Sequence, residues 1–164
     1  MNNFLEKFEK MRIAGKLAAR TLDMLTDNIK PGVTTDHIDK LGYEFIRDNG
    51  GYSAPLFYRG FKKSLCTSLN HVVCHGIPSD RILKEGDAIN VDVTTVINEH
   101  YGDTSRMFCL GKTPVKINNL IDATYESMML AIKLLKPGIK LGDIGYMIQS
   151  FVEKKGFSVV RDFC

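Results

Sequence analysis

The sequence predicts a mixed α/β (α+β) domain in which helices cover an antiparallel sheet. Three observations predict it. Apolar residues recur with a helical period at both ends of the chain, they alternate with period two in the middle, and the two helical regions share an internal repeat. The length of 164 residues suits one compact domain. The predicted order is helix, helix, strands, helix, helix, and then the beginning of another strand.

Two helices are predicted before the strands. The first covers residues 5–29 and ends at the Pro-Gly pair at 31–32. Thr34 or Thr35 is the candidate N-cap of the second helix, which runs to about Asn49. The apolar or small residues that give the first helix its period are Leu5, Phe8, Met11, Gly15, Ala18, Leu22 and Leu25.

Strands are predicted between residues 65 and 110. Ile89, Val91 and Val93 alternate with polar residues, which is the pattern of a strand with one buried face. After Pro114 the helical period returns for two more helices, which end at the Pro-Gly pair at 137–138 and at Gly156. Residues 157–160 then read as the start of a further strand.

An internal repeat relates the two helical regions. Lys30-Pro31-Gly32-Val33 matches Lys136-Pro137-Gly138-Ile139, and the offset is 106 residues. Five more pairs match at this offset: Ile38 with Ile144, Leu41 with Met147, Phe45 with Phe151, Ile46 with Val152, and Gly50 with Gly156. We therefore expect one domain over 1–164 with two pseudo-repeats, about 5–110 and about 115–164, the second cut short. The alternative is a coincidental likeness between two helical hairpins.

The composition excludes several functional classes. A formal net charge of +3 is too small to argue for DNA binding, and the local cluster of Arg59, Lys62 and Lys63 reads as a solvated loop. No apolar run reaches the roughly 18 residues of a membrane span, and the charged N-terminus has no signal-peptide core. We expect a cytoplasmic protein that does not contact a membrane.

Two aspartates are the first candidates for chemistry. Asp92 lies in the strand that contains Val91 and Val93 but points to the opposite face, and a turn near Asn98-Glu99 leads to a strand with Asp103. A hairpin with this turn places the two aspartates nearly opposite each other. Neighbouring carboxylates repel, and a divalent cation between them relieves the repulsion. The alternative is a pair of exposed hairpin aspartates without a ligand.

A histidine and an aromatic segment are the next candidates. His75 precedes a Gly-Ile-Pro turn and should face a cleft or solvent, although a lone histidine is more often only a satisfied polar residue. Phe57, Tyr58 and Phe61, with Cys66 beyond them, have the character of an apolar substrate pocket or of ordinary packing.

The chain resembles the type I methionine aminopeptidases over nearly its whole length. The most specific segments are Cys66-Thr67-Ser68-Leu69-Asn70, Val72-Val73-Cys74-His75-Gly76-Ile77-Pro78, Gly86-Asp87-Ala88-Ile89-Asn90-Val91-Asp92-Val93-Thr94 and Gly102-Asp103-Thr104-Ser105. The resemblance implies the pita-bread fold, whose two halves are related by a pseudo-twofold axis. It also implies two-metal hydrolysis that removes the initiator methionine from nascent chains, with Co, Mn, Fe or Zn as the two divalent ions.

The resemblance assigns roles to particular residues. Asp92 and Asp103 match metal ligands, and His75 matches a residue that contacts the substrate near the scissile amide. Tyr58, Phe61 and Cys66 match positions that line the methionine pocket. A weaker match places a monovalent cation at the backbone of Asn70 and Val72. Two departures from the family pattern are Lys62 in place of a frequent proline, and His71 in place of a common acidic residue.

The resemblance also implies that the metal site is incomplete. In the family the ligand histidine lies in a Gly-His-Gly segment directly after the residue that matches Cys164, and two glutamate ligands follow later. We therefore expect weak metal binding and no activity from the chain alone. A complementary C-terminal fragment, self-association, an inactive remnant, and a non-catalytic module that binds peptides or the ribosome are the alternatives.

Overall fold

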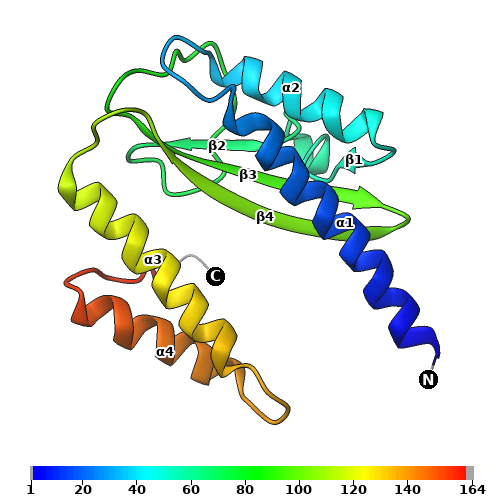
Figure 1. The fold of residues 1–164 in the computed structure, drawn as a ribbon, viewed down its shortest axis with the longest axis vertical. Helices are drawn as coiled ribbons and strands as arrows, with labels where there is room; N and C mark the ends of the chain where they lie inside the picture. Colours follow the sequence, from blue (N-terminus) through cyan, green and yellow to red (C-terminus); the bar gives the residue numbers. More distant parts are fainter. Residues whose placement is uncertain (1, 162–164) are drawn as a thin grey trace. The chain divides into compact units, whose positions relative to one another are not determined.

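The computed structural model describes residues 2–161 and divides after Thr113 into two compact units. Within these residues the first unit holds two long helices, a short 3-10 helix and four strands, and the second unit holds two helices (Figure 1). The bounds are α1 Asn2–Thr26, α2 Thr35–Asp48, β1 Tyr52–Ser53, η1 Tyr58–Gly60, β2 Cys66–Leu69, β3 Ala88–Ile97, β4 His100–Cys109, α3 Val115–Leu134 and α4 Leu141–Lys154.

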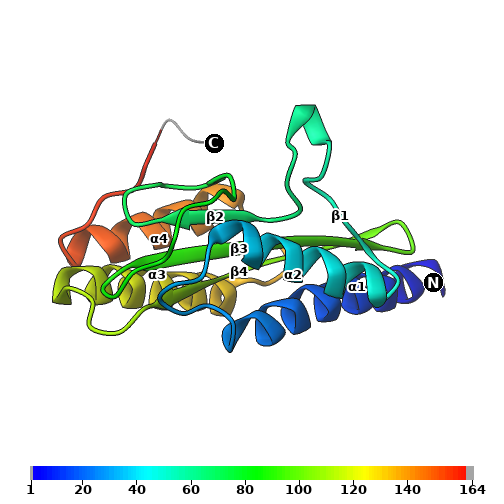
Figure 2. The same cartoon turned by 90° about the horizontal axis from the view of Figure 1, so that it is seen from above.

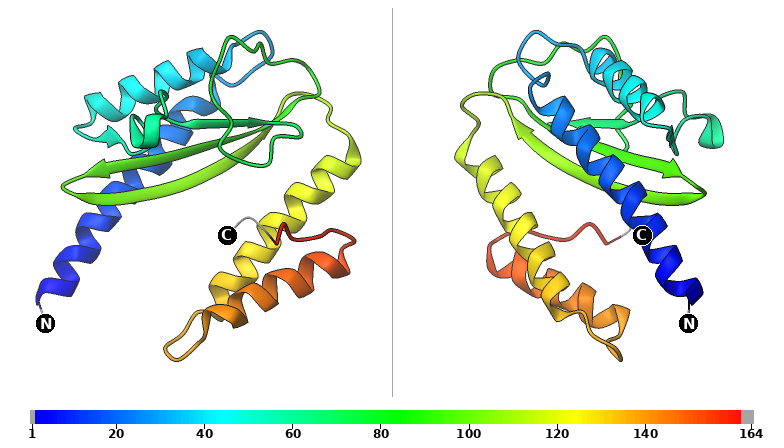
Figure 3. Two further views of the ribbon diagram at one scale, coloured as in Figure 1. Left: turned by 180° about the vertical axis from the view of Figure 1, so that it is seen from behind. Right: turned by 45° about the vertical axis from the view of Figure 1, so that its right-hand side comes forward.

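The strands form one antiparallel sheet around β3. β4 pairs with β3 along its whole length, so β1 and β2 share the other edge, β1 beside Thr95 and Val96 and β2 beside residues 89–92. The β3–β4 turn has two residues, Asn98 and Glu99, which both have positive φ, as tight hairpin turns require. The long twisted hairpin is visible from behind in Figure 3.

The helices α1 and α2 cover one face of this sheet, while the turn that contains η1 projects on the other side (Figure 2). Ile89, Val91 and Val93 point toward the helices and are fully buried. The apolar faces of the two helices meet them in a single core, whose helical members are Leu17, Ala18, Leu22, Leu25, Ile38 and Ile46. Asn90, Asp92 and Thr94 consequently point to the opposite face, which the helices leave open.

In the second unit, α3 packs against α4 through small and aliphatic side chains: Ala123, Ser127, Ala131 and Val152. The approach to α4 repeats the approach to α2. Gly32 and Gly138 both have φ of 92°, and each boundary of α4 lies 106 residues after the matching boundary of α2, Thr35 to Leu141 and Asp48 to Lys154.

The prediction of helices on one face of an antiparallel sheet is confirmed, and Thr34 is the N-cap of α2, its hydroxyl accepting from the His37 N–H at 3.2 Å. α1 ends at Thr26, earlier than predicted, because the Asn28 and Ile29 N–H groups both turn back to the Leu25 carbonyl. The twofold relation of the two pseudo-repeats stays a prediction.

The predicted strand over 157–160 is wrong. These residues have no regular secondary structure, because a strand needs a partner ladder and residues 2–161 provide none there. Cys164, after which the resemblance places the ligand histidine, lies outside the described residues. Across the described part of the chain, no helix combines the length and the apolar character that a membrane span requires.

Candidate active site

The two candidate carboxylates lie on neighbouring strands and on the same open face of the sheet. Asp92 on β3 is opposite Ser105, and Asp103 on β4 is opposite Thr94. The aspartates are therefore diagonal neighbours on the same face. They are not directly opposite each other, because Asp103 lies two residues along β4 from Ser105, the partner of Asp92. The reason is the two-residue turn, which pairs Ile97 with His100. Diagonal residues have Cα atoms about 7–8 Å apart, a span that one ion and its ligands can bridge.

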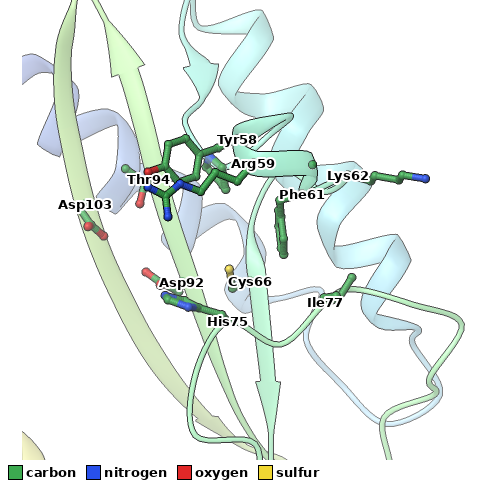
Figure 4. A pocket seen from close by; sticks show the side chains of 12 residues that line it. Tyr58, Arg59, Phe61, Lys62, Cys66, His75, Ile77, Asp92, Thr94 and Asp103 are labelled. Atoms are coloured by element: carbon green, nitrogen blue, oxygen red, sulfur yellow. The ribbon is translucent and has the colours of Figure 1, made fainter. Parts of the chain in front are cut away.

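A cavity of about 740 Å³ lies over this face (Figure 4). Its walls come from the turn containing η1, from β2, from the loop after β2, and from β3 and β4. It brings together the residues that the sequence singled out for catalysis, metal binding and the apolar pocket: Tyr58, Phe61, Cys66, His75, Asp92 and Asp103. Cys66 and Asp92 are far apart in the sequence, but the pairing of β2 with β3 places them directly beside each other.

The loop after β2 holds His75 at this cavity. Gly76 lies so close to β2 that a Cβ atom there would overlap the Thr67 carbonyl group. The Thr67 N–H donates to the Gly76 carbonyl at 2.8 Å, and the Gly76 N–H donates to Ser68 Oγ at 3.2 Å. These bonds hold the backbone on both sides of the glycine against β2. The exposed side chain of His75 thus enters the cavity from an anchored loop.

The electrostatics of the site favour a cation. Burial raises the pKa of Asp92, the Asp103 charge raises it further, and His75 acts in the opposite direction. A half-buried carboxylate that is disfavoured by burial and by a like charge is stabilised when a positive ion binds beside it. Oxygen donors of this kind suit divalent cations. The donor chemistry therefore fits a divalent metal at Asp92 and Asp103.

The donor set is nevertheless small. Within residues 2–161 no three side chains of the types His, Cys, Asp and Glu gather closely enough to hold a metal together. Metal affinity grows with ligand number and with a prefolded cage. Two carboxylates by themselves are expected to bind a divalent ion weakly.

Cys66 is a buried thiol on the wall of the cavity beside Asp92. Burial raises the pKa of its thiol to about 11, with Asp92 as the next cause. A raised pKa favours the neutral thiol, which behaves as a small apolar group. Together with the ring of Phe61, Cys66 therefore makes the cavity next to the carboxylates apolar.

Asn70 and Val72 lie at a separate pocket of about 330 Å³. The Asn70 side-chain amide donates to Asp87 Oδ1 at 2.9 Å, and its oxygen accepts from the Ala88 N–H at 3.0 Å. The side-chain amide of Asn70 is thus hydrogen-bonded within the protein, so a cation here would bind the backbone carbonyl oxygens of Asn70 and Val72. The monovalent cation site stays a prediction.

Six cavity residues were not predicted as functional: Pro55, Arg59, Gly60, Lys62, Ile77 and Thr94. Thr94 was within reach of the sequence, because it lies two residues after Asp92 in the same strand and therefore faces the same side of the sheet. Ile77 lies in an irregular loop, where alternation does not apply. Arg59 was read as part of a solvated loop. No periodic pattern marks the irregular turn that carries it into the cavity.

The sequence matches the family model of metallopeptidase family M24 over residues 9–164. A methionine aminopeptidase of Rickettsia prowazekii is 56% identical over 156 residues, which are 95% of this chain and 60% of that protein. The methionine aminopeptidase of Escherichia coli K12 is 48% identical over 161 residues, 97% of this chain and 61% of that protein. The chain thus spans about 60% of the length of these curated relatives.

Solved structures give the same result. The methionine aminopeptidase from Rickettsia prowazekii superposes with a TM-score of 0.94 at 55% identity, covering 96% of this chain and 64% of that one. The enzyme from Thermotoga maritima has a TM-score of 0.93 at 38% identity, with the same coverage. An X-Pro aminopeptidase from Thermotoga maritima, at 19% identity and a TM-score of 0.81, shares the fold, with 93% of this chain and 41% of that one covered. The predicted pita-bread α/β fold is confirmed, and the chain belongs to metallopeptidase family M24.

Proposed function

We propose that this chain forms the carboxylate side of a methionine aminopeptidase site, which removes the N-terminal methionine of nascent proteins by two-metal hydrolysis. The observation that carries the proposal is the single cavity that joins Asp92, Asp103 and His75 to the apolar group of Tyr58, Phe61 and Cys66. The names of the relatives support the same activity. A cytoplasmic location and contact with the ribosome belong to this proposal.

Each part of the cavity has a separate task. Asp92 and Asp103 hold divalent ions, for which Co, Mn, Fe and Zn are the candidates. The metals supply Lewis-acid polarisation of the scissile carbonyl and a more acidic water. His75 donates a hydrogen bond to the oxygen on which negative charge develops during attack, which lowers the barrier. The apolar wall of Phe61 and Cys66 removes the methionine side chain from water.

The proposal is tested with a chimera. The whole chain is joined to the part of the Rickettsia prowazekii enzyme that follows the matched region, and methionine release from a Met-Ala-Ser peptide is measured with added Mn²⁺ or Co²⁺. We expect turnover by the chimera and none by the chain alone. Asp92→Asn and Asp103→Asn should each lower the turnover of the chimera at least about 100-fold, since each removes a metal ligand.

Asp80→Asn is the matched control, because Asp80 is an exposed aspartate that does not line the cavity. Calorimetry with Mn²⁺ on the chain alone provides a second readout, in which both ligand variants should weaken the binding. Unchanged turnover and unchanged Mn²⁺ affinity in both variants would refute the assignment of the two aspartates.

A non-catalytic role is the second candidate for the chain by itself. It is favoured by the small donor set, since the described residues offer no cluster of three metal-binding side chains. Such a module binds peptides with a free N-terminus without cleaving them. Peptide binding by the chain in the presence of a chelator would support this role, and binding that depends on added metal would favour the enzyme.

A further inference from the structure

A cationic side chain lines the cavity without belonging to the proposed machinery. Arg59 lies in η1 and is exposed, and the wall it forms is not part of the sheet. In Figure 4 its side chain points from the turn toward the β3–β4 hairpin, whereas Lys62 points the opposite way. Lys63 is already committed, because its ammonium group lies 2.6 Å from Asp36 Oδ1. Lys62 also lines the cavity, but its side chain extends away from the β3–β4 hairpin, so Arg59 is the cation of this segment that points toward the strands carrying Asp92 and Asp103 (Figure 4).

The backbone around Arg59 is held in an unusual conformation. Arg59 has φ of 47° and ψ of 33°, and Phe57 and Gly60 also have positive φ. Left-handed backbone is unfavourable for residues other than glycine, and it persists where the surroundings impose it. Here a hydrogen-bonded turn imposes it: the Phe57 N–H donates to the Phe61 carbonyl at 2.7 Å, and the Phe61 N–H donates to the Tyr58 carbonyl at 2.9 Å.

The guanidinium group of Arg59 is oriented but not neutralised. It lies 5.4 Å from the centroid of the Tyr58 ring, a distance suited to a cation–π contact. In the described part of the chain no carboxylate lies within ion-pair distance of it. Stacking leaves the N–H donors at the edge of the guanidinium plane available, and these donors match the two oxygens of a carboxylate.

The negative and positive side chains of the cavity therefore lie on different walls. The acidic pair lies on the floor, which is the sheet, and Arg59 lies on the turn that projects from it (Figure 2). If the first residue of a peptide lies against the floor, its next residues can reach the turn that carries Arg59. We propose that Arg59 is a specificity residue that binds a carboxylate on the residues following the N-terminal one, so that the cavity favours peptides that are acidic near their N-terminus. This inference rests on the proposed function.

The test measures the binding of fluorescent peptides to the whole chain by anisotropy, with Mn²⁺ present. The probes are the isosteric pair Met-Ala-Asp-Asp-Gly and Met-Ala-Asn-Asn-Gly, each labelled at its C-terminus. We expect the acidic peptide to bind roughly two- to fivefold more tightly at low salt, the range of one exposed charge pair. The preference should shrink as salt rises, because exposed charges are screened.

Three variants identify the residue responsible. Arg59→Gln should bring the affinity ratio of the two peptides to about one, and Arg59→Lys should keep part of the preference because the charge remains. Arg12→Gln is the control with the same charge change, since Arg12 lies on α1 and pairs with Glu9 at 3.2 Å. It should leave the ratio as in the parent chain. A circular dichroism spectrum of each variant verifies that the fold is retained.

The outcomes separate this inference from the proposed function. Equal affinity of the parent chain for both peptides, or an unchanged ratio in Arg59→Gln, overturns the role of Arg59. Acetylated versions of both peptides test the proposed function itself, which requires a free amine. If acetylation weakens binding but the ratio is one, only the role of Arg59 fails. If acetylation has no effect, or no peptide binds, the role of Arg59 fails, and the turnover of the chimera decides the proposed function separately.

Discussion

Gly102 is the point at which a helix comes closest to the sheet, one residue before Asp103. A Cβ atom there would overlap the backbone of Ala14 in α1. Thr95, paired with Gly102, donates its hydroxyl to the Ala14 carbonyl at 2.9 Å. This contact fixes the strands that carry the two aspartates against α1. The glycine therefore serves the site as well as the core.

We predict that Gly102→Ala lowers the free energy of unfolding by about 2 kcal/mol or more, because two backbones have to separate. Urea unfolding of the chain measures this change. Gly15→Ala is the matched control, since no heavy atom lies within 4 Å of a Cβ there and α1 should gain about 0.5–1 kcal/mol. An unchanged unfolding midpoint in Gly102→Ala would show that α1 is not fixed at this point.

Asp92 and Asp87 should affect stability with opposite sign. Burial and the Asp103 charge raise the pKa of Asp92, so its ionised form costs stability when no metal is bound. Burial alone would raise the pKa of Asp87 too. Hydrogen bonds from the Asn70 side chain and the Lys84 backbone nevertheless lower the pKa of Asp87, so its ionised form adds stability.

In the presence of a chelator at pH 7, Asp92→Asn should therefore raise the free energy of unfolding and Asp87→Asn should lower it. The Asp92→Asn difference should shrink while the pH falls toward about 4, the ordinary pKa of a carboxyl group, because the raised pKa of Asp92 lets it protonate above that value. The Asp87→Asn difference should shrink only below about 4, because the pKa of Asp87 is lowered. Chemical unfolding at pH 7 and pH 3 measures the two effects. If Asp92→Asn destabilises the metal-free chain at pH 7, the repulsion between the aspartates is not the dominant effect.

At the scale of elements, the two 14-residue helices that follow the Pro-Gly turns, α2 and α4, differ at their N-caps. Thr34 caps α2 through its hydroxyl, whereas Lys140 caps α4 with a side chain that has no acceptor atom. At α4 the hydrogen bond runs the other way: the Lys140 backbone N–H donates to the side chain of Asp143, in the first turn of the helix, at 3.1 Å (Oδ2). The two helices have the same length but not the same stabilisation at their first turns.

We predict that Lys140→Thr stabilises α4 and that Thr34→Ala destabilises α2, each by about 1 kcal/mol. Hydrogen exchange resolved to single elements would register this as a change of roughly fivefold, slower in α4 and faster in α2. Each helix acts as the control for the other. Faster exchange of α4 in Lys140→Thr would mean that the lysine has a contact worth more than the cap.

Helices and strands with a regular apolar period could be predicted from the sequence. Features that depend on which strand pairs with which, or on an irregular turn, could not. The apolar period and the Pro-Gly turns predicted the four long helices, and alternation around Val91 predicted β3. The strand over 157–160 was wrong because a local apolar run does not specify a partner. The diagonal placement of Asp92 and Asp103 depends on the exact turn, and the direction of Arg59 depends on an irregular backbone.

At the scale of the whole molecule, the two units bury their side chains to different degrees. The first unit has a sheet that buries the apolar faces of α1 and α2. In the second unit α3 has an additional apolar stripe at helical spacing beside the one that meets α4. Its members on α3 are Tyr125, Met128 and Ile132, which are 60%, 46% and 50% exposed, and the C-cap residue Leu135, 55% exposed, follows them. Neighbouring exposed apolar side chains of this size commonly mark a surface that associates.

We predict that the chain self-associates through this stripe of α3, because each aliphatic or aromatic side chain withdrawn from water contributes about 1.5–3 kcal/mol. Sedimentation velocity should show an average mass that rises with protein concentration. Ile132→Glu places a charge in the stripe and should shift the chain toward the monomer. Asn119→Glu adds the same charge to an exposed position of α3 outside the stripe and should not. A sedimentation coefficient of the parent chain that does not depend on concentration, or an equal response to both substitutions, would show that α3 does not mediate association.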